Sequence, residues 1–169
     1  MDFPRSEEDD TLIAFDPLDV VEHVLLSENL NFDRTDDGDL AFAINGDWAA
    51  YELWFAWRPD AGCLQLCLAL DMRVEAAAMT KTYELLSRVN QRVWLGHFEI
   101  WPEDNELLFR HALPLPEGER PTLAQAAAMI DAAVEAADRF YPAFNFLLTA
   151  GRTPAEAMDS CLFETVGQA

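Results

Sequence analysis

The chain has 169 residues, of which 51% are apolar, so it can build one sizeable hydrophobic core but not two, and we expect a single domain. Its 31 acidic and 11 basic residues leave a formal net charge of −20, a field that repels a phosphate backbone, so we expect no nucleic-acid partner. No run of apolar residues is long enough to span a membrane, and the first ten residues are acidic, the reverse of the basic start of a signal peptide, so we expect a cytoplasmic location.

The first fourteen residues combine four clustered acids with Pro4 and Ser6 and show no periodicity, which predicts an acidic mobile tail over residues 1–14. A single α+β domain is expected to follow over residues 15–169. It begins with a helix, because Asp16 and Pro17 supply an N-cap and a proline for the first turn, and apolar residues recur at helical spacing up to about Ser27.

The next segment alternates in hydropathy between turn signals, which predicts a meander of four antiparallel strands. The strands are expected at residues 32–35, 40–45, 48–58 and 63–72, and the turn signals between them are Asp36-Asp37-Gly38, Asn45-Gly46 and Pro59-Asp60-Ala61-Gly62. One face of the last two strands is strongly apolar, and we expect the helices to pack on it. Its residues are Tyr51, Leu53, Phe55, Trp57, Leu64, Leu66, Leu68 and Leu70.

Helical spacing returns over residues 75–95. The expected core face consists of Met79, Tyr83, Leu86, Val89 or Asn90, and Val93. Lys81, Arg88 and Arg92 align along one side of this helix, and Glu84 stands one turn before Arg88 as an ion-pair partner. Two interpretations stay open: a solvated face with one ion pair, or a docking stripe for an acidic partner.

Two more strands and two helices complete the predicted domain. The strands cover residues 97–101 and 106–113, and a capping box of Thr122 and Gln125 opens a long helix in which Pro142 predicts a kink. A second capping box at residues 153–156 opens a short helix that ends near residue 163. The core stripe expected on the long helix is Leu123, Ala127, Ile130, Val134, Ala137, Tyr141, Phe144 and Leu148. The predicted fold is therefore an antiparallel meander sheet with helices on one side, in the order α-β-β-β-β-α-β-β-α-α.

No pattern in the chain predicts a catalytic site or a metal site. The three histidines lack the spacing of a metal pair, and the thiols of Cys63, Cys67 and Cys161 have no activating neighbour in sequence, so we expect them to be structural. Residues 33–44 resemble the start of a calcium loop, but the twelfth position is Ile44 rather than glutamate, so we predict a hairpin turn that does not bind calcium. We expect no catalytic residue, no metal and no cofactor, and hence a protein that is not an enzyme.

The chain carries more aromatic bulk than a meander and its helices need, and some of it falls off the predicted core faces. We expect part of this surplus to meet a protein partner; the alternative is that the face assignments are wrong and all of it is core. The candidate partner-binding residues are Trp54, Trp101, Phe140, Phe144, Phe146, Lys81, Arg88 and Arg92. Phe140 and Phe146 in particular project away from the predicted core stripe, which predicts a homodimer through residues 140–148 or through an exposed strand edge.

Three motifs make the chain similar to a known family. They are Trp94-Leu95-Gly96-His97-Phe98-Glu99-Ile100-Trp101, Gly151-Arg152-Thr153-Pro154-Ala155-Glu156-Ala157, and Glu164-Thr165-Val166-Gly167-Gln168-Ala169. The chain resembles the YbjN-like proteins, also called bacterial sensory transduction regulators, from about Asp16 to the C-terminus. The resemblance implies a fold like that of type III secretion chaperones, often dimeric, with Gly96 releasing the second helix. It implies no catalytic residue.

The sequence and the resemblance together favour a non-enzymatic regulator or chaperone-like adaptor that binds a protein partner of unknown identity through apolar sheet and helix surface, in bacterial sensory or stress signalling. Two alternatives stay open. One is a small-molecule-binding protein or enzyme whose site the sequence does not reveal, and the other is a structural subunit of a larger assembly.

Overall fold

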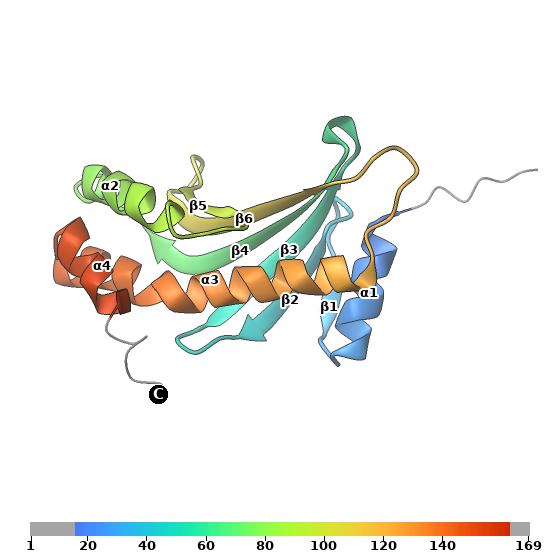
Figure 1. The fold of residues 1–169 in the computed structure, drawn as a ribbon, viewed down its shortest axis with the longest axis horizontal. Helices are drawn as coiled ribbons and strands as arrows, with labels where there is room; N and C mark the ends of the chain where they lie inside the picture. Colours follow the sequence, from blue (N-terminus) through green and yellow to red (C-terminus); the bar gives the residue numbers. More distant parts are fainter. Residues whose placement is uncertain (1–15, 163–169) are drawn as a thin grey trace, which may run out of the picture.

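The computed structural model describes residues 16–162, which form a six-stranded antiparallel sheet and four α-helices (Figure 1). The elements follow the predicted order and are α1 Leu18–Ser27, β1 Phe32–Arg34, β2 Leu40–Asn45, β3 Ala50–Arg58, β4 Cys63–Arg73, α2 Met79–Asn90, β5 His97–Ile100, β6 Glu106–Pro114, α3 Leu123–Ala150 and α4 Pro154–Leu162. In space the strands lie in the order β1-β2-β3-β4-β6-β5. The predicted meander and the predicted second hairpin are thus confirmed, and β6 joins them by pairing with β4.

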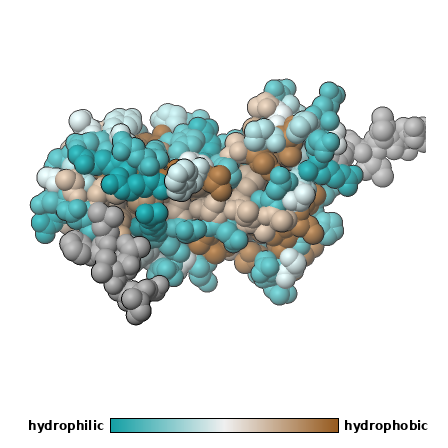
Figure 2. Space-filling view, viewed as in Figure 1, coloured by the Kyte–Doolittle hydropathy of each residue, from teal (hydrophilic) through white to brown (hydrophobic). Residues whose placement is uncertain are grey.

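The long helix α3 crosses one face of the sheet (Figure 1). Helix α1 packs near the start of α3, whereas α2 and α4 gather at its far end. Figure 2 shows the same side of the molecule: apolar side chains follow α3 and concentrate around α1 and the neighbouring strands, while the end formed by α2 and α4 is mostly hydrophilic. Among residues 16–162 no helix is both long and apolar enough to cross a membrane.

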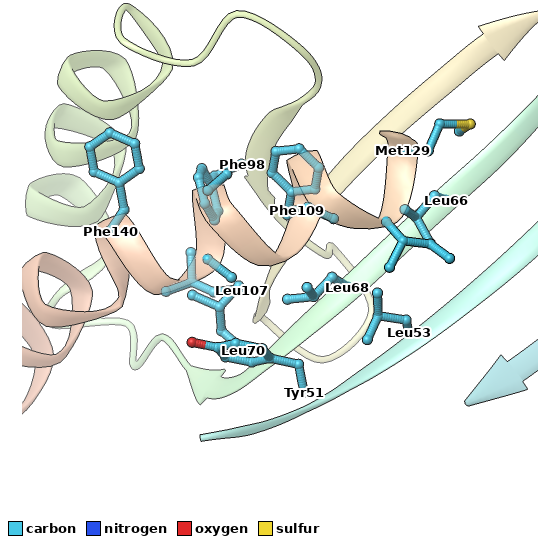
Figure 3. Close-up of a cluster of buried hydrophobic side chains, with 14 of the residues drawn as sticks. Tyr51, Leu53, Leu66, Leu68, Leu70, Phe98, Leu107, Phe109, Met129 and Phe140 are labelled. Atoms are coloured by element: carbon cyan, nitrogen blue, oxygen red, sulfur yellow. The ribbon is translucent and has the colours of Figure 1, made fainter. Parts of the chain in front are cut away.

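The predicted apolar face of β3 and β4 is buried beneath α3. Strand pairing aligns Leu53 with Leu68 and Phe55 with Leu66, and all four side chains are at most 1% exposed. Strand β6 extends the same face with Leu107 and Phe109, and Figure 3 shows these side chains pointing toward α3. The core therefore lies between one face of the sheet and the helix, as the alternation of the strand residues indicates.

Helix α2 is shorter than predicted and turned about its axis. It ends at Asn90 rather than near residue 95, and Tyr83, which was expected in the core, is 58% exposed. The side chains that it buries are Thr82, Leu85, Leu86 and Val89. The helix stops where the Asn90 side chain turns to the backbone of Phe98, so the following residues form a loop.

Helix α3 begins at the predicted capping box, in which Thr122 and Gln125 bond to each other's backbone N–H groups, but its buried face differs from the expected stripe. Leu123 is 57% exposed, whereas Phe140 is 1% exposed and packs edge-on against Phe98. The buried residues are Ala126, Met129, Ile130, Ala133, Ala136, Ala137, Phe140, Pro142, Ala143, Phe144 and Leu147. Alanines form much of this face, because small side chains let the helix approach the sheet closely.

Helix α3 continues through Pro142, and the structure compensates for the donor that proline lacks. A proline cannot donate to the carbonyl four residues earlier, which here belongs to Asp138. The indole Nε1–H of Trp48, in the β2–β3 turn, donates to that carbonyl at 2.9 Å, and the Trp48 ring stacks on Tyr141. The turn between two strands thus completes the hydrogen bonding of the helix.

The side chain of Asp138 strengthens the same contact. Its Oδ1 accepts the backbone N–H of Asp47 at 2.9 Å and the hydroxyl of Tyr51 at 2.7 Å. Gly46 sits so close to Tyr51 and Asp138 that a Cβ on it would overlap both side chains. Burial and the neighbouring Asp138 raise the pKa of Tyr51, so its hydroxyl stays protonated and donates a hydrogen bond to the Asp138 side chain.

Replacing Tyr51 by phenylalanine removes only the hydroxyl that binds Asp138. We expect Tyr51→Phe to lower the free energy of unfolding by about 1–3 kcal/mol, because a hydrogen bond to a charged acceptor is lost while the ring stays packed. Urea unfolding measures the change. Tyr83→Phe, at an exposed position, serves as the control and should leave stability unchanged; equal losses in the two variants would show that the hydroxyl contributes nothing.

Candidate partner-binding site

The loop between α2 and β5, residues 91–96, presents two large apolar side chains to solvent. Trp94 is 97% exposed and Leu95 is 52% exposed. Single exposed leucines are common on protein surfaces, but an indole with nearly its whole surface in water is not, since tryptophan is highly buried on average. Two adjacent exposed apolar side chains, one of them an indole, make this loop a candidate interaction site.

Specific contacts fix both ends of this loop. At its start, the Asn90 side chain accepts the Phe98 N–H at 2.8 Å and donates to the Phe98 carbonyl at 3.0 Å. At its end, Gly96 has φ +74°, and a Cβ there would lie 2.4 Å from the Phe109 ring and 2.7 Å from the Arg110 carbonyl oxygen. Only glycine fits that position without strain. The exposed indole is therefore held on a defined turn.

A groove separates this loop from α3. Its walls are Arg92, Val93, Trp94 and Leu95 on the loop side and Ala132, Glu135, Ala136, Arg139 and Phe140 on the helix side. We call these residues the Trp94 groove. Its volume is about 130 Å³, close to that of an apolar cavity that accommodates one benzene ring. The groove is thus large enough for one aromatic or branched aliphatic side chain of a partner.

Two guanidinium groups flank the Trp94 groove. Arg139 lies over the Phe140 ring at 5.1 Å, and Arg92 donates to the Arg88 carbonyl at 2.8 Å. Among the described residues, neither guanidinium forms an ion pair with a carboxylate, in contrast to Arg34, which binds three acidic side chains of α1 and its N-terminus. Although the whole chain has a net charge of −20, the groove therefore holds two guanidinium groups that can bind a carboxylate of another molecule.

The predicted basic stripe is divided among three environments. Arg92 lines the Trp94 groove, whereas Arg88 pairs with Glu84 at 2.7 Å, as the solvated-face interpretation expects. Lys81 lies at the other end of α2, beside a cavity of about 540 Å³ between the end of β4, the start of α2 and the end of α3. The structure therefore does not join the three basic residues into one site.

The predicted aromatic candidates are also separated. Phe140 is 1% and Phe144 0% exposed, so the expectation that Phe140 projects away from the core is wrong. Phe140 lies on the same face of α3 as the buried alanines, and that face packs on the sheet. Phe146 is 44% exposed near the end of α3. Trp54 and Trp101 are half-buried, and Trp54 lies opposite Cys67 on the sheet face away from α3. A role for Phe146, Trp54 or Trp101 in partner binding stays a prediction.

Sequence reasoning missed Trp94 and Leu95 because it placed them on a helix that ends at residue 95. A signal was present: Asn90, whose side chain can bond backbone groups, stands six residues before Gly96. Those two residues bracket a loop rather than a further helical turn.

The described residues that line the Trp94 groove include no cysteine and no histidine. Burial raises the pKa of the Cys67 thiol to about 11, so its reactive thiolate is scarce at neutral pH. Burial and the neighbouring His97 lower the pKa of His111. Within residues 16–162, no three His, Cys, Asp or Glu side chains gather in a way that could hold a metal ion. The prediction that the thiols are structural remains a prediction.

The fold and the site define a class: an α+β protein whose antiparallel sheet carries one long helix and displays an apolar groove. The family model for YbjN, described as "Putative bacterial sensory transduction regulator", matches residues 17–146, and the chain belongs to the YbjN family. The motif at residues 151–157 lies beyond that match, and the C-terminal motif lies outside the described residues.

One solved structure supports the same fold. It is the crystal structure of "YbjN, a putative transcription regulator from E. coli", which superposes with a TM-score of 0.53 at 11% sequence identity. The similarity covers 87% of this chain and 93% of that one. At this identity the likeness shows the fold and not the activity. No curated protein matches the chain.

Proposed function

We propose that this protein is a non-enzymatic regulator, or chaperone-like adaptor, that acts by binding a protein partner at the Trp94 groove. The observation that carries the proposal is the 97% exposure of Trp94 on a loop fixed by Asn90 and Gly96. Membership of a family described as regulatory agrees with it. We also propose that the protein acts in bacterial sensory or stress signalling.

The energetics of the groove favour binding over a purely structural role. Covering an indole removes about 200 Å² from water, which contributes about 5 kcal/mol at about 25 cal/mol per Å² before the cost of association. A loop already held in place loses little further conformational entropy when a partner binds. Tryptophan is also among the residues that contribute most to binding at interfaces. Trp94 therefore has the properties of an anchor side chain.

A photocrosslinking experiment tests the proposal. We replace Leu95, which lies beside Trp94 in the groove and is 52% exposed, by p-benzoylphenylalanine in the full chain, irradiate the cells that normally produce the protein, and identify adducts by mass spectrometry. We expect one dominant protein adduct, because the partner covers this position. Leu123, which is 57% exposed at the start of α3, is the matched control and should give no such adduct. Equal or absent crosslinking at the two positions would refute a partner site at Trp94.

We also propose that the chain forms a homodimer of moderate affinity. Two features support it: the exposed ring of Phe146, and the edge of β6, which β5 covers only as far as Arg110 while β4 pairs with it up to Pro114. The free edge of a strand offers backbone donors and acceptors to another chain. At physiological salt the Debye length is about 8 Å, so charges far from the contact contribute little repulsion.

Sedimentation equilibrium tests the homodimer. We expect two chains per particle at micromolar concentration. Phe146→Asp should shift the equilibrium toward monomer if the interface includes the end of α3, and a dimer that survives this change would place the interface at the β6 edge. Leu123→Asp, another exposed position on α3, is the control. A wild-type chain that stays monomeric up to about 100 µM, where even a dissociation constant of 10 µM leaves most of it paired, would contradict the proposal.

A further inference from the structure

We infer that the partner segment bound at the Trp94 groove is acidic, and that Arg92 and Arg139 recognise carboxylates placed beside the apolar side chain that enters the groove. This inference rests on the proposed function and adds the chemistry of the partner. The observations behind it are the two arginines without a carboxylate partner among the described residues and the apolar surface between them.

The local charge decides which peptide fits. Arg92 and Arg139 carry two positive charges into the groove, and Glu135 carries one negative charge, so the lining is net positive. The net charge of the whole chain is −20, but screening over about 8 Å limits its effect on a segment bound in the groove. A guanidinium binds a carboxylate through two parallel hydrogen bonds, a geometry that an ammonium ion does not offer. Carboxylates are therefore the complementary groups.

The apolar lining of the groove determines which uncharged side chain the partner segment carries. The groove has Trp94 and Leu95 on the loop side and the small residues Ala132 and Ala136 on the α3 side, and its volume is about 130 Å³. One leucine, isoleucine or phenylalanine side chain fits this space. The segment that satisfies both parts carries one such side chain flanked by aspartate or glutamate. A basic segment would bring its charge against both arginines.

Peptide selection tests this chemistry without knowledge of the natural partner. A phage library of random twelve-residue peptides is selected on the immobilised full-length chain, on Arg92→Glu with Arg139→Glu, and on Trp94→Ala. Arg73→Glu with Arg152→Glu is the control, because it changes the net charge equally at exposed positions outside the groove. A fluorescein-labelled copy of the peptide most enriched on the wild type is then used for fluorescence anisotropy.

On the wild type and the control variant, we expect enrichment of peptides with acidic residues beside an aromatic or branched aliphatic residue. The Arg92→Glu, Arg139→Glu variant should reverse this preference toward basic residues. It should also weaken binding of the labelled peptide by about tenfold or more, because two charge pairs become repulsive. Trp94→Ala should abolish enrichment, since the apolar anchor is lost.

The outcomes separate this inference from the proposed function. Enriched peptides that need Trp94 but show no acidic preference, or keep that preference after both arginines are reversed, would overturn the inference and leave the proposed function intact. Failure of the wild type to enrich any peptide, or enrichment that does not depend on Trp94, would overturn both.

Discussion

The contact between the β2–β3 turn and Asp138 of α3 is the interaction on which the arrangement of this molecule depends. Pro142 leaves the carbonyl of Asp138 without its helical donor, and the Trp48 indole supplies one, while the Asp138 carboxylate binds Tyr51 and the backbone of Asp47. These bonds join parts of the chain that are about ninety residues apart. They fix where α3 lies across the sheet, because Tyr51 is itself part of the buried face of β3.

Once α3 is placed, its alanine-rich surface becomes one wall of the Trp94 groove. The other wall depends on β5, whose outer edge is occupied at Phe98 by the side chain of Asn90. This clamp satisfies a backbone donor and acceptor that would otherwise be open on an edge strand, and it also determines where the loop leaves the helix. The opposite edge is held differently, by Arg34 of β1 bound to acidic side chains around α1. Polar contacts thus hold both edge strands of the sheet, β5 and β1, to the neighbouring helices.

The sequence allowed the elements to be predicted well because their signals are local. Alternation defined the strands, glycine and asparagine marked the turns, and Thr122 with Gln125 marked the start of α3. The buried faces of α2 and α3 were harder to predict. On an alanine-rich helix the large residues do not define the core side, so Phe140 was assigned to the surface although it lies against Phe98. Tertiary packing, and not the periodicity of large apolar residues, determines which face of these helices is buried.

The candidate site could not be predicted for a related reason. The exposure of Trp94 follows from a bond between Asn90 and Phe98 across a loop without periodic pattern, and from the space that Gly96 leaves for Phe109. Arg92 was identified as a basic candidate, but its neighbour Arg139 comes from α3, and only the folded chain brings the two into one groove. The proposal of an acidic partner therefore needs the structure as well as the composition.

The central claim is that the free protein holds one tryptophan fully in solvent on a fixed loop. Fluorine NMR of the chain labelled with 5-fluorotryptophan tests this claim most directly. The Trp94 resonance is assigned as the one that Trp94→Phe removes, and its chemical shift is then compared in H₂O and D₂O. The account predicts the largest solvent isotope shift of the five tryptophans for Trp94, and a smaller one for Trp48, which stacks on Tyr141. A Trp94 resonance as protected from solvent as that of Trp48 would contradict it.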